Sequence, residues 1–192
     1  MQNIIDFLEK TKRGPQVILP KDAALIISET GINKDWKVVD AGSGSGFLAM
    51  ILGNLGCKVY TYEKREDFYK LARDNIKKSG LKNIKIFNKD ITKGIDQKKV
   101  DLVTLDMKNP EKAISNAFNS LKPRGFLVVY SMHIEQVQDV LKEMKKYEFE
   151  PRVMENIQRE WQTISGFLRP KTQLAHTGFL IIARKIKQIL LT

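Results

Sequence analysis

A glycine-rich segment with an acidic residue at its entrance follows the first strongly apolar stretch of the sequence. It carries, in order, Asp40, Gly42, Gly44 and Gly46. Glycine lets a backbone turn sharply and come close to a ligand, because it has no Cβ. The spacing differs from the dinucleotide motif, whose third glycine would fall at Phe47, and no Gly-Lys-Ser/Thr follows as in a phosphate-binding loop. The segment therefore suits a ligand with a cationic amino group rather than a pyrophosphate.

Two further carboxylates follow the next two predicted strands. Glu63 ends the second strand, where an open α/β sheet places the acid that binds a ribose diol, and Asp90 comes just after the third strand. Each alone is more often a solvated loop residue. Because ligands gather at the carboxyl ends of such strands, Asp40, Glu63 and Asp90 are expected to converge. This ordered set favours S-adenosylmethionine as the ligand.

Asp106 ends the fourth predicted strand, directly after an apolar run. A carboxylate here could accept a hydrogen bond from the exocyclic amine of an adenine, hold N1 in line with a methyl group and take the released proton. The competing interpretation is a loop carboxylate that caps the helix near Pro110. Spacing alone leaves both readings of Asp106 open.

Alternating strand and helix patterns predict the elements that position these residues. We expect helices over residues 3–11, Phe47–Leu55, Glu66–Ser79, Glu111–Leu121 and Ile134–Lys146, and one with Pro20 in its first turn that continues over Ala23–Thr30. We expect strands over Trp36–Asp40, Lys58–Tyr62, Ile84–Phe87, Val100–Leu105, Phe126–Tyr130, Glu148–Asn156 and Ala175–Arg184. The fold class is α/β, a Rossmann-like, mostly parallel seven-stranded sheet with helices on both faces and an antiparallel C-terminal strand. A loop of about 18 residues precedes the last strand, and a loop of that length usually has a function.

Composition narrows the class of protein. The 192 residues are 42% apolar and 29% charged, with apolar stretches too short to cross a bilayer, so we expect a cytoplasmic protein. One cysteine and two histidines make a structural metal site improbable. The net charge of +11 favours a polyanionic partner such as nucleic acid, although a lysine-rich surface is also common in proteins from hot environments.

Four segments together resemble one family of enzymes. They are residues 13–22 (RGPQVILPKD), 40–46 (DAGSGSG), 105–110 (LDMKNP), and 169–170 (RP) with 176–179 (HTGF). Residues 32–150 resemble the class I methyltransferases in general. The four segments resemble the tRNA (adenine-N1)-methyltransferase family, which includes the catalytic subunit of the eukaryotic two-subunit enzyme.

This resemblance implies an S-adenosylmethionine-dependent enzyme that methylates adenine-58 in the T-loop of tRNA, and adenine-57 as well in some members. It implies Asp106 as the catalytic residue, Glu63 and Asp90 as contacts of the ribose and adenine, and Gln16 as a lining residue of the cofactor site. It also implies a homotetramer. We expect the basic long loop with Trp161, Arg169 and Lys171 to hold tRNA, although a lone Trp is more often anchored to protein. His176 is expected to be structural.

The chain also departs from the family pattern. Residues 1–31 are expected to form an N-terminal helical segment packed on a methyltransferase domain of residues 32–192, where relatives usually carry a small β domain. Leu19 stands where relatives often have an aromatic residue or histidine, and Lys108 replaces a usual proline. Two alternatives remain, a decarboxylating precorrin methyltransferase and a non-catalytic tRNA-binding subunit. The tail motif and Asp106 argue against the former, and the intact glycine segment and Asp106 argue against the latter.

Overall fold

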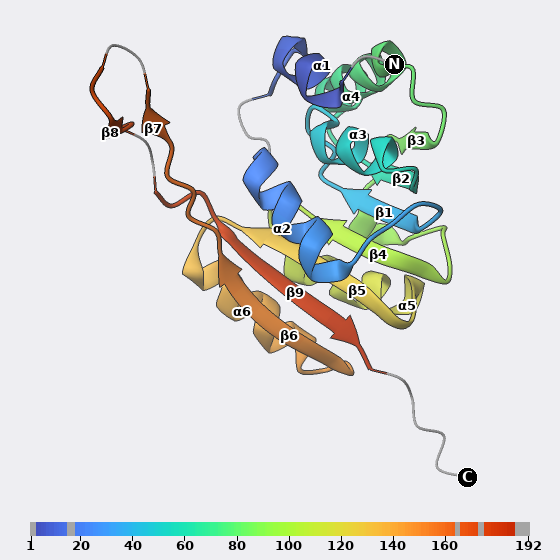
Figure 1. The fold of residues 1–192 in the computed structure, drawn as a ribbon. Helices are drawn as coiled ribbons and strands as arrows, with labels where there is room; N and C mark the ends of the chain where they lie inside the picture. The colour runs from blue at the N-terminus through green and yellow to red at the C-terminus, as the bar shows by residue number, and fades with distance from the viewer. Residues whose placement is uncertain (1–2, 15–17, 164–165, 173–174, 187–192) are drawn as a thin grey trace.

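A seven-stranded sheet forms the centre of the molecule, with helices on both faces (Figure 1). The computed structural model describes residues 3–14, 18–163, 166–172 and 175–186. The strand order across the sheet is β3-β2-β1-β4-β5-β9-β6. The strands are β1 Lys37–Ala41, β2 Lys58–Tyr62, β3 Ile84–Phe87, β4 Val100–Leu105, β5 Leu121–Ser131, β6 Phe149–Glu155 and β9 Phe179–Lys185. This architecture confirms the predicted fold class.

The helices divide between the two faces of the sheet. They are α1 Ile4–Lys10, α2 Pro20–Thr30, α3 Phe47–Asn54, α4 Glu66–Ser79, α5 Ile114–Ser120 and α6 Ile134–Met144, with 3₁₀ turns η1 Ile91–Lys93 and η2 Pro110–Ala113. Residues from α1 to α4 pack in one core cluster, and residues from α5, α6 and both 3₁₀ turns pack in the other. None of the described helices is long and apolar enough to cross a bilayer.

Buried residues alternate between the two core clusters along each central strand. Val38 in β1 and Leu102 in β4 face the cluster of α2 and α3, whereas their neighbours Val39 and Val103 face the cluster of α5 and α6. Because successive strand side chains point to opposite faces, a strand covered on both sides must be apolar at nearly every position. The buried positions of β1, β2 and β4 meet this requirement except at Asp40, Thr61 and Thr104, where both threonines bond to Asp40. Parallel pairing sets the carboxyl ends of these strands side by side.

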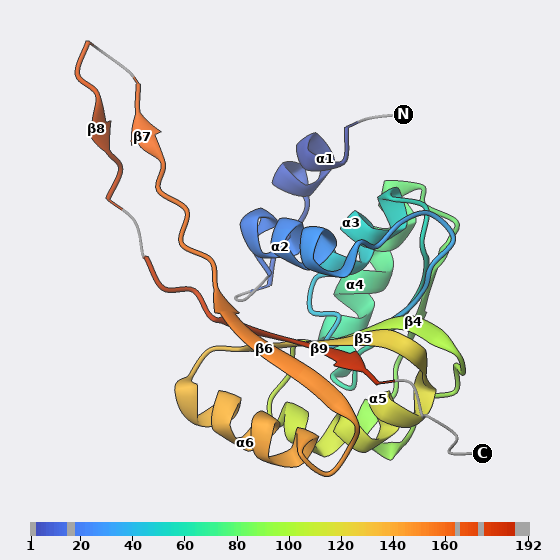
Figure 2. The ribbon, with the colours of Figure 1, turned by 60° about the horizontal axis from the view of Figure 1, so that its bottom comes forward.

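Strand β9 is antiparallel to both of its neighbours, β5 and β6. The long connection between β6 and β9 contains two short strands, β7 Trp161–Gln162 and β8 Arg169–Pro170, which pair with each other. They form an arm that projects away from the sheet (Figure 2). The sequence predicted only a loop here, because strands of two residues leave no readable alternation.

Most predicted boundaries lie within two residues of the observed ones, and three elements differ by more. Strand β5 starts at Leu121, five residues early, because Leu121 pairs with Val100 before a shift in register. The predicted helix 111–121 is a 3₁₀ turn followed by the shorter α5. Strand β9 starts at Phe179 rather than at Ala175, because His176 and Thr177 bond to groups outside the ladder.

Candidate active site

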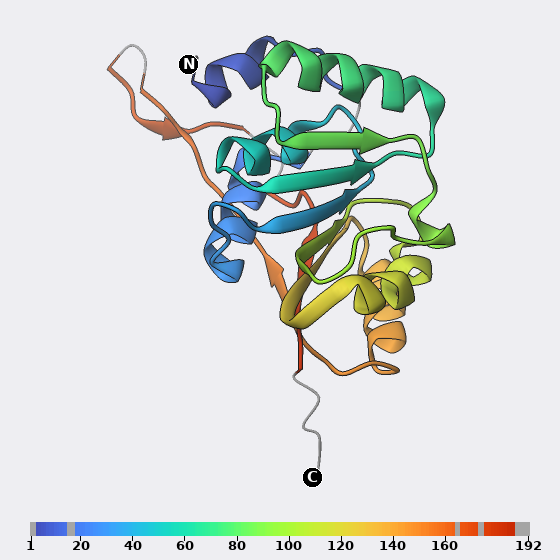
Figure 3. The same cartoon turned by 90° about the vertical axis from the view of Figure 1, so that its right-hand side faces the viewer.

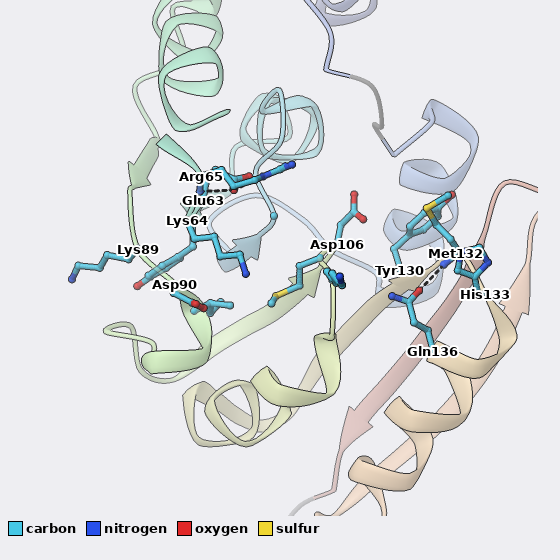
Figure 4. A pocket seen from close by; sticks show the side chains of 15 residues that line it. Glu63, Lys64, Arg65, Lys89, Asp90, Asp106, Tyr130, Met132, His133 and Gln136 are labelled. Carbon is cyan, nitrogen blue, oxygen red and sulfur yellow. Dashed lines mark hydrogen bonds and ion pairs between the residues drawn. The ribbon is translucent and has the colours of Figure 1, made fainter. Parts of the chain in front are cut away.

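A cavity of about 520 Å³ lies at the carboxyl ends of the parallel strands (Figure 4). Glu63, Asp90 and Asp106 follow β2, β3 and β4 respectively, and all three line it. A second, much smaller hollow under the glycine segment shares Gly42 and Asp106 with it. Of the three carboxylates expected to converge, Glu63 and Asp90 line this cavity, whereas Asp40 lines only the smaller hollow. Asp106 lines both hollows.

The glycine segment packs directly against the end of β4. Gly42 has a φ of +83°, and a Cβ on it would fall 1.8 Å from the backbone oxygen of Asp106. The Asp106 amide in turn donates to the carbonyl of Ala41 at 2.8 Å. Gly46, also at φ +83°, begins α3. Any side chain at Gly42 would push the segment off the strand that carries Asp106.

Asp40 lies beneath the glycine segment and is 2% exposed. Its two carboxylate oxygens accept hydrogen bonds from the hydroxyls of Thr61 at 2.6 Å and Thr104 at 2.7 Å, its register partners on β2 and β4. Ser43 of the segment bonds to Thr61 at 2.5 Å. Burial raises the pKa of Asp40, while the two threonine hydrogen bonds lower it and nearby Glu63 raises it. This placement favours a role in bracing the segment.

Glu63 is 3% exposed and is held by backbone donors. Its Oε2 accepts from the amide of Gly44 at 3.1 Å, and its Oε1 accepts from the amide of Arg65 at 3.0 Å. Asn88 donates to its carbonyl at 2.9 Å, tying the ends of β2 and β3 together. Oε1 also accepts from Nε of the Arg65 guanidinium at 3.3 Å, whereas Oε2 keeps a second lone pair. The fixed carboxylate can therefore accept from a ligand hydroxyl at Oε2, and from a second one at Oε1 where that hydroxyl replaces the exposed Arg65 side chain.

Asp90 begins the 3₁₀ turn η1 and is partly exposed. Its Oδ1 accepts from the amide of Thr92 at 3.0 Å and from the hydroxyl of Thr92 at 2.7 Å. These bonds to the Thr92 side chain and amide lower the pKa of Asp90 against the opposing effect of burial. Asp90 therefore stays ionised on the same wall of the cavity as Glu63.

Asp106 lines the same cavity as Asp90, but its pKa is raised. Burial, together with repulsion from Asp40 and Glu63, raises its pKa from 3.8 to about 7, and Arg65 opposes the rise. A carboxyl group with a pKa near neutrality can take up and release a proton at the working pH, which suits a general base. The helix-cap alternative finds no support, since η2 begins with Asn109 as its N-cap residue.

The opposite wall of the cavity comes from the end of β5 and the start of α6. Tyr130, Met132, His133 and Gln136 lie there, with Asp106 between them and the wall of Glu63 and Asp90 (Figure 4). The sequence analysis missed these four residues. The strand-end rule that selected Asp106 also applies to the end of β5, and that rule would have selected Tyr130.

A buried polar cluster supports this second wall. The Lys21 ammonium donates to Asp22 at 2.7 Å and to the Thr177 hydroxyl at 2.8 Å, and the Tyr130 hydroxyl donates to the Thr177 carbonyl at 2.6 Å. A Cβ on Gly178 would fall 2.5 Å from the Tyr130 ring, so glycine permits this approach. Lys21 and Asp22 thus meet Thr177, remote from them in sequence, beside the cavity.

His176 and the arm lie outside the cavity. The His176 ring contacts Glu155 through Nδ1 at 2.5 Å and the carbonyl of Met132 through Nε2 at 3.2 Å, at the start of β9. Trp161, Arg169 and Lys171 are exposed on the arm, where Lys171 forms an ion pair with Glu160. None of these three lines the cavity among the residues that the structure describes.

Two remaining expectations concern Gln16 and metals. Gln16 lies outside the described residues. Within the described ranges, no group of three or more His, Cys, Asp or Glu side chains is placed to hold a metal ion.

A family model for the tRNA methyltransferase complex GCD14 subunit matches residues 10–165. The chain belongs to the GCD14 family. Among relatives of this GCD14-family chain is the tRNA (adenine(57)-N(1)/adenine(58)-N(1))-methyltransferase TrmI of Methanocaldococcus jannaschii, which is 35% identical over 94% of this chain and 76% of its own length. The crystal structure of the tRNA (m1A58) methyltransferase TrmI from Aquifex aeolicus superimposes with a TM-score of 0.88 at 31% identity, over 97% of this chain and 77% of that one. The predicted family and the predicted methyltransferase activity are confirmed.

The precorrin alternative finds support in the fold alone. A precorrin-6y C5,15-methyltransferase from Geobacter metallireducens superimposes with a TM-score of 0.78, over 93% of this chain and 95% of that one. Its sequence identity is 17%, so the likeness extends to the fold and not to the substrate. Membership of the GCD14 family favours tRNA methylation over precorrin methylation.

Proposed function

We propose that this GCD14-family chain transfers a methyl group from S-adenosylmethionine to N1 of adenine in tRNA. The target is adenine-58 of the T-loop, with adenine-57 as a candidate second target, in line with the names of its relatives. The observation that carries the proposal is Asp106, a carboxyl group with a pKa near 7 between two walls of one cavity.

The residues on the wall of Glu63 and Asp90 fit the cofactor. The cavity volume falls within the roughly 300–1,000 Å³ of small-molecule sites. Glu63 offers fixed carboxylate oxygens to ribose hydroxyls, Asp90 an ionised carboxylate to the adenine amine, and Gly42 a backbone that a ligand can approach closely. Buried Asp40 adds a carboxylate beside the hollow under the glycine segment, which suits a cationic ligand. When bound, S-adenosylmethionine supplies an electrophilic methyl group on a sulfonium.

Asp106 then acts on the acceptor base. Its carboxylate accepts a hydrogen bond from the N6 amine of adenine, which orients N1, and it takes the N6 proton as positive charge develops on the base. Tyr130 and Met132 on the opposite wall offer an aromatic ring and a thioether for the base to pack against. The base must leave the tRNA stack to reach this cavity, at a cost of a few kcal/mol.

Charge at the mouth of the cavity matches a polyanionic substrate. Lys64, Arg65, Lys89 and Lys108 line the cavity with exposed side chains, whereas Glu63 lies deep. Exposed cations around an acidic interior suit an RNA whose phosphates stay outside while one base enters. The arm with Trp161, Arg169 and Lys171 is proposed to contact the same tRNA.

The test is product analysis. The purified chain, S-adenosylmethionine and an unmodified tRNA transcript should yield 1-methyladenosine, detected by mass spectrometry of the digested nucleosides. A transcript with guanine at position 58 distinguishes the two targets, since any 1-methyladenosine it yields comes from another adenine. Absence of 1-methyladenosine with several transcripts, under conditions in which the cofactor binds, would contradict the proposal.

A further inference from the structure

A further cavity among the described residues lies between α1 and α4, and it shares no lining residue with the active-site cavity. Its volume is about 270 Å³, and its lining residues are Phe7, Lys10, Thr11, Lys12, Asn75 and Lys78. The two helices lie along the same flank of the sheet (Figure 3). Half of the lining side chains are lysines, and no acidic residue contributes to the lining.

Within the described part of the chain, the lysines of this cavity form no ion pair with an acidic side chain. Lys10, Lys12 and Lys78 are exposed, and among the described residues the ion pairs of the chain involve other cations. The acid nearest in sequence to Lys78, Asp74, bonds to Arg73 at 3.3 Å. Three ammonium groups around one hollow repel one another, and a bound anion relieves that repulsion.

The backbone around the lysines is held in place. Leu8 anchors α1 in the core at 3% exposure, and the Thr11 hydroxyl donates to the carbonyl of Phe7 at 2.7 Å. The buried Asn75 side chain donates to the carbonyl of Lys12 at 3.1 Å and to that of Ser45 in the glycine segment at 2.9 Å. The cavity is therefore preformed, and its position is fixed relative to the active site.

We propose that this lysine cavity binds a phosphodiester group of the RNA substrate, at a distance from the base that enters the active site. The proposal rests on the proposed function for the identity of the RNA. The volume lies below the roughly 300–1,000 Å³ of small-molecule sites, so it fits a charged group of a larger ligand better than a whole nucleotide. Lysines bind phosphate as point charges from several directions, without the planar geometry that arginine requires.

The test compares two variants with the same change in net charge. Lys10→Gln, Lys12→Gln and Lys78→Gln together remove the cavity lysines. Lys34→Gln, Lys58→Gln and Lys98→Gln together remove three exposed lysines near the amino ends of β1, β2 and β4. Affinity for a tRNA transcript is measured by fluorescence anisotropy between 50 and 200 mM salt. The cavity variant should bind about fivefold or more weakly at 100 mM salt, with the slope of log affinity against log salt reduced by about 0.7–1. The control variant should change affinity less than twofold.

The single variant Lys12→Gln distinguishes phosphate binding from stabilisation of the helix ends. Lys10 and Lys78 lie in the last turns of α1 and α4, where cations stabilise the helix, whereas Lys12 follows α1. Equal affinity and salt slope in the wild type and in both cavity variants would overturn the proposal, as would an equal loss in the control variant. Inorganic phosphate that binds the cavity at micromolar concentration without weakening tRNA binding would also overturn it.

Failure of the proposed function gives a different result. If the wild type forms no 1-methyladenosine while the cavity variant alone loses RNA affinity, the cavity stands and the reaction is wrong. If the wild type methylates tRNA and the cavity variant does so with unchanged kcat/KM, the reaction stands and the cavity proposal is wrong.

Discussion

At the scale of single residues, the proposed chemistry depends on different pKa values for carboxylates that line the same cavity. Asp90 receives two hydrogen bonds from Thr92 that keep its pKa low, whereas Asp106 is half-buried near two other acids and its pKa rises to about 7. Carboxylates of one cavity with such different pKa values can take different roles. Asp90 suits a permanent acceptor, and Asp106 suits proton transfer.

The raised pKa of Asp106 predicts a pH-dependent rate. Only ionised Asp106 can take the N6 proton, so the rate at subsaturating tRNA and cofactor should rise about tenfold per pH unit below pH 7 and level off above it. Initial rates between pH 5.5 and 9 check this, with filter binding to show that tRNA affinity stays constant. A rate that is flat from pH 5.5 to 8 would argue against Asp106 as the titrating base.

Substitution of Gly42 should affect stability and cofactor binding far more than substitution of another glycine. Gly42→Ala places a Cβ 1.8 Å from the Asp106 carbonyl, so we expect a loss of about 3 kcal/mol or more in the free energy of unfolding and at least tenfold weaker cofactor binding. Gly80→Ala is the matched control, because Gly80 has a similar φ of +76° and open space around it. Its cost should be about 1 kcal/mol, with cofactor affinity unchanged. Urea unfolding and calorimetry measure both, and equal effects would refute close packing as the reason for Gly42.

At the scale of elements, most of the scaffold could be predicted from the sequence, and the arm could not. Strands such as Lys58–Tyr62 and Val100–Leu105 match their predicted bounds, because each is a short apolar run bounded by polar residues or glycine. The strand-end rule predicted that Asp40, Glu63 and Asp90 converge, and of these Glu63 and Asp90 share the cavity while Asp40 lies beneath the glycine segment. The wall with Tyr130 and its bond to Thr177 depends on a contact between residues 47 positions apart, which no local pattern reveals.

A substitution on the arm should weaken tRNA binding without changing the stability of the fold. Trp161 is 52% exposed, so Trp161→Ala should leave the melting temperature within about 1 °C, since little buried surface is lost. If Trp161 stacks on a tRNA base, KM for tRNA should rise about fivefold or more with kcat unchanged. Steady-state kinetics and thermal unfolding measure this. An unchanged KM would remove Trp161 from the tRNA contact, and Gln162→Ala on the same strand controls for disturbance of the arm.

At the scale of the whole molecule, the charge of +11 acquires a specific arrangement. Acids occupy the interior of the cavity, exposed cations surround its mouth, and three further lysines lie between α1 and α4. Net charge alone was consistent with a lysine-rich surface of no particular function. A buried acidic interior with cationic surroundings matches instead a substrate that inserts a base and leaves its phosphates outside.

The buried acids predict a stability effect of the whole chain. The folded state raises the pKa of Asp106 from 3.8 to about 7, so it retains a proton that the unfolded chain releases between these values, and stability from this group falls as pH rises from about 4 to about 7. Asp106→Asn avoids that loss. After allowance for partial exposure, it should be more stable than the wild type by roughly 1–2 kcal/mol at pH 8 and equally stable near pH 4. Urea unfolding at both pH values decides this, and a variant that is less stable at pH 8 would contradict the burial of charge.

The central claim is that Asp106 performs the reaction on a base while other residues hold the cofactor. The most direct measurement compares the wild type with Asp106→Ala for cofactor affinity by calorimetry and for formation of 1-methyladenosine in a single turnover. We predict a dissociation constant within about threefold of wild type and a rate lower by about 10²–10⁴-fold. A near-normal rate of 1-methyladenosine formation by Asp106→Ala would contradict the account.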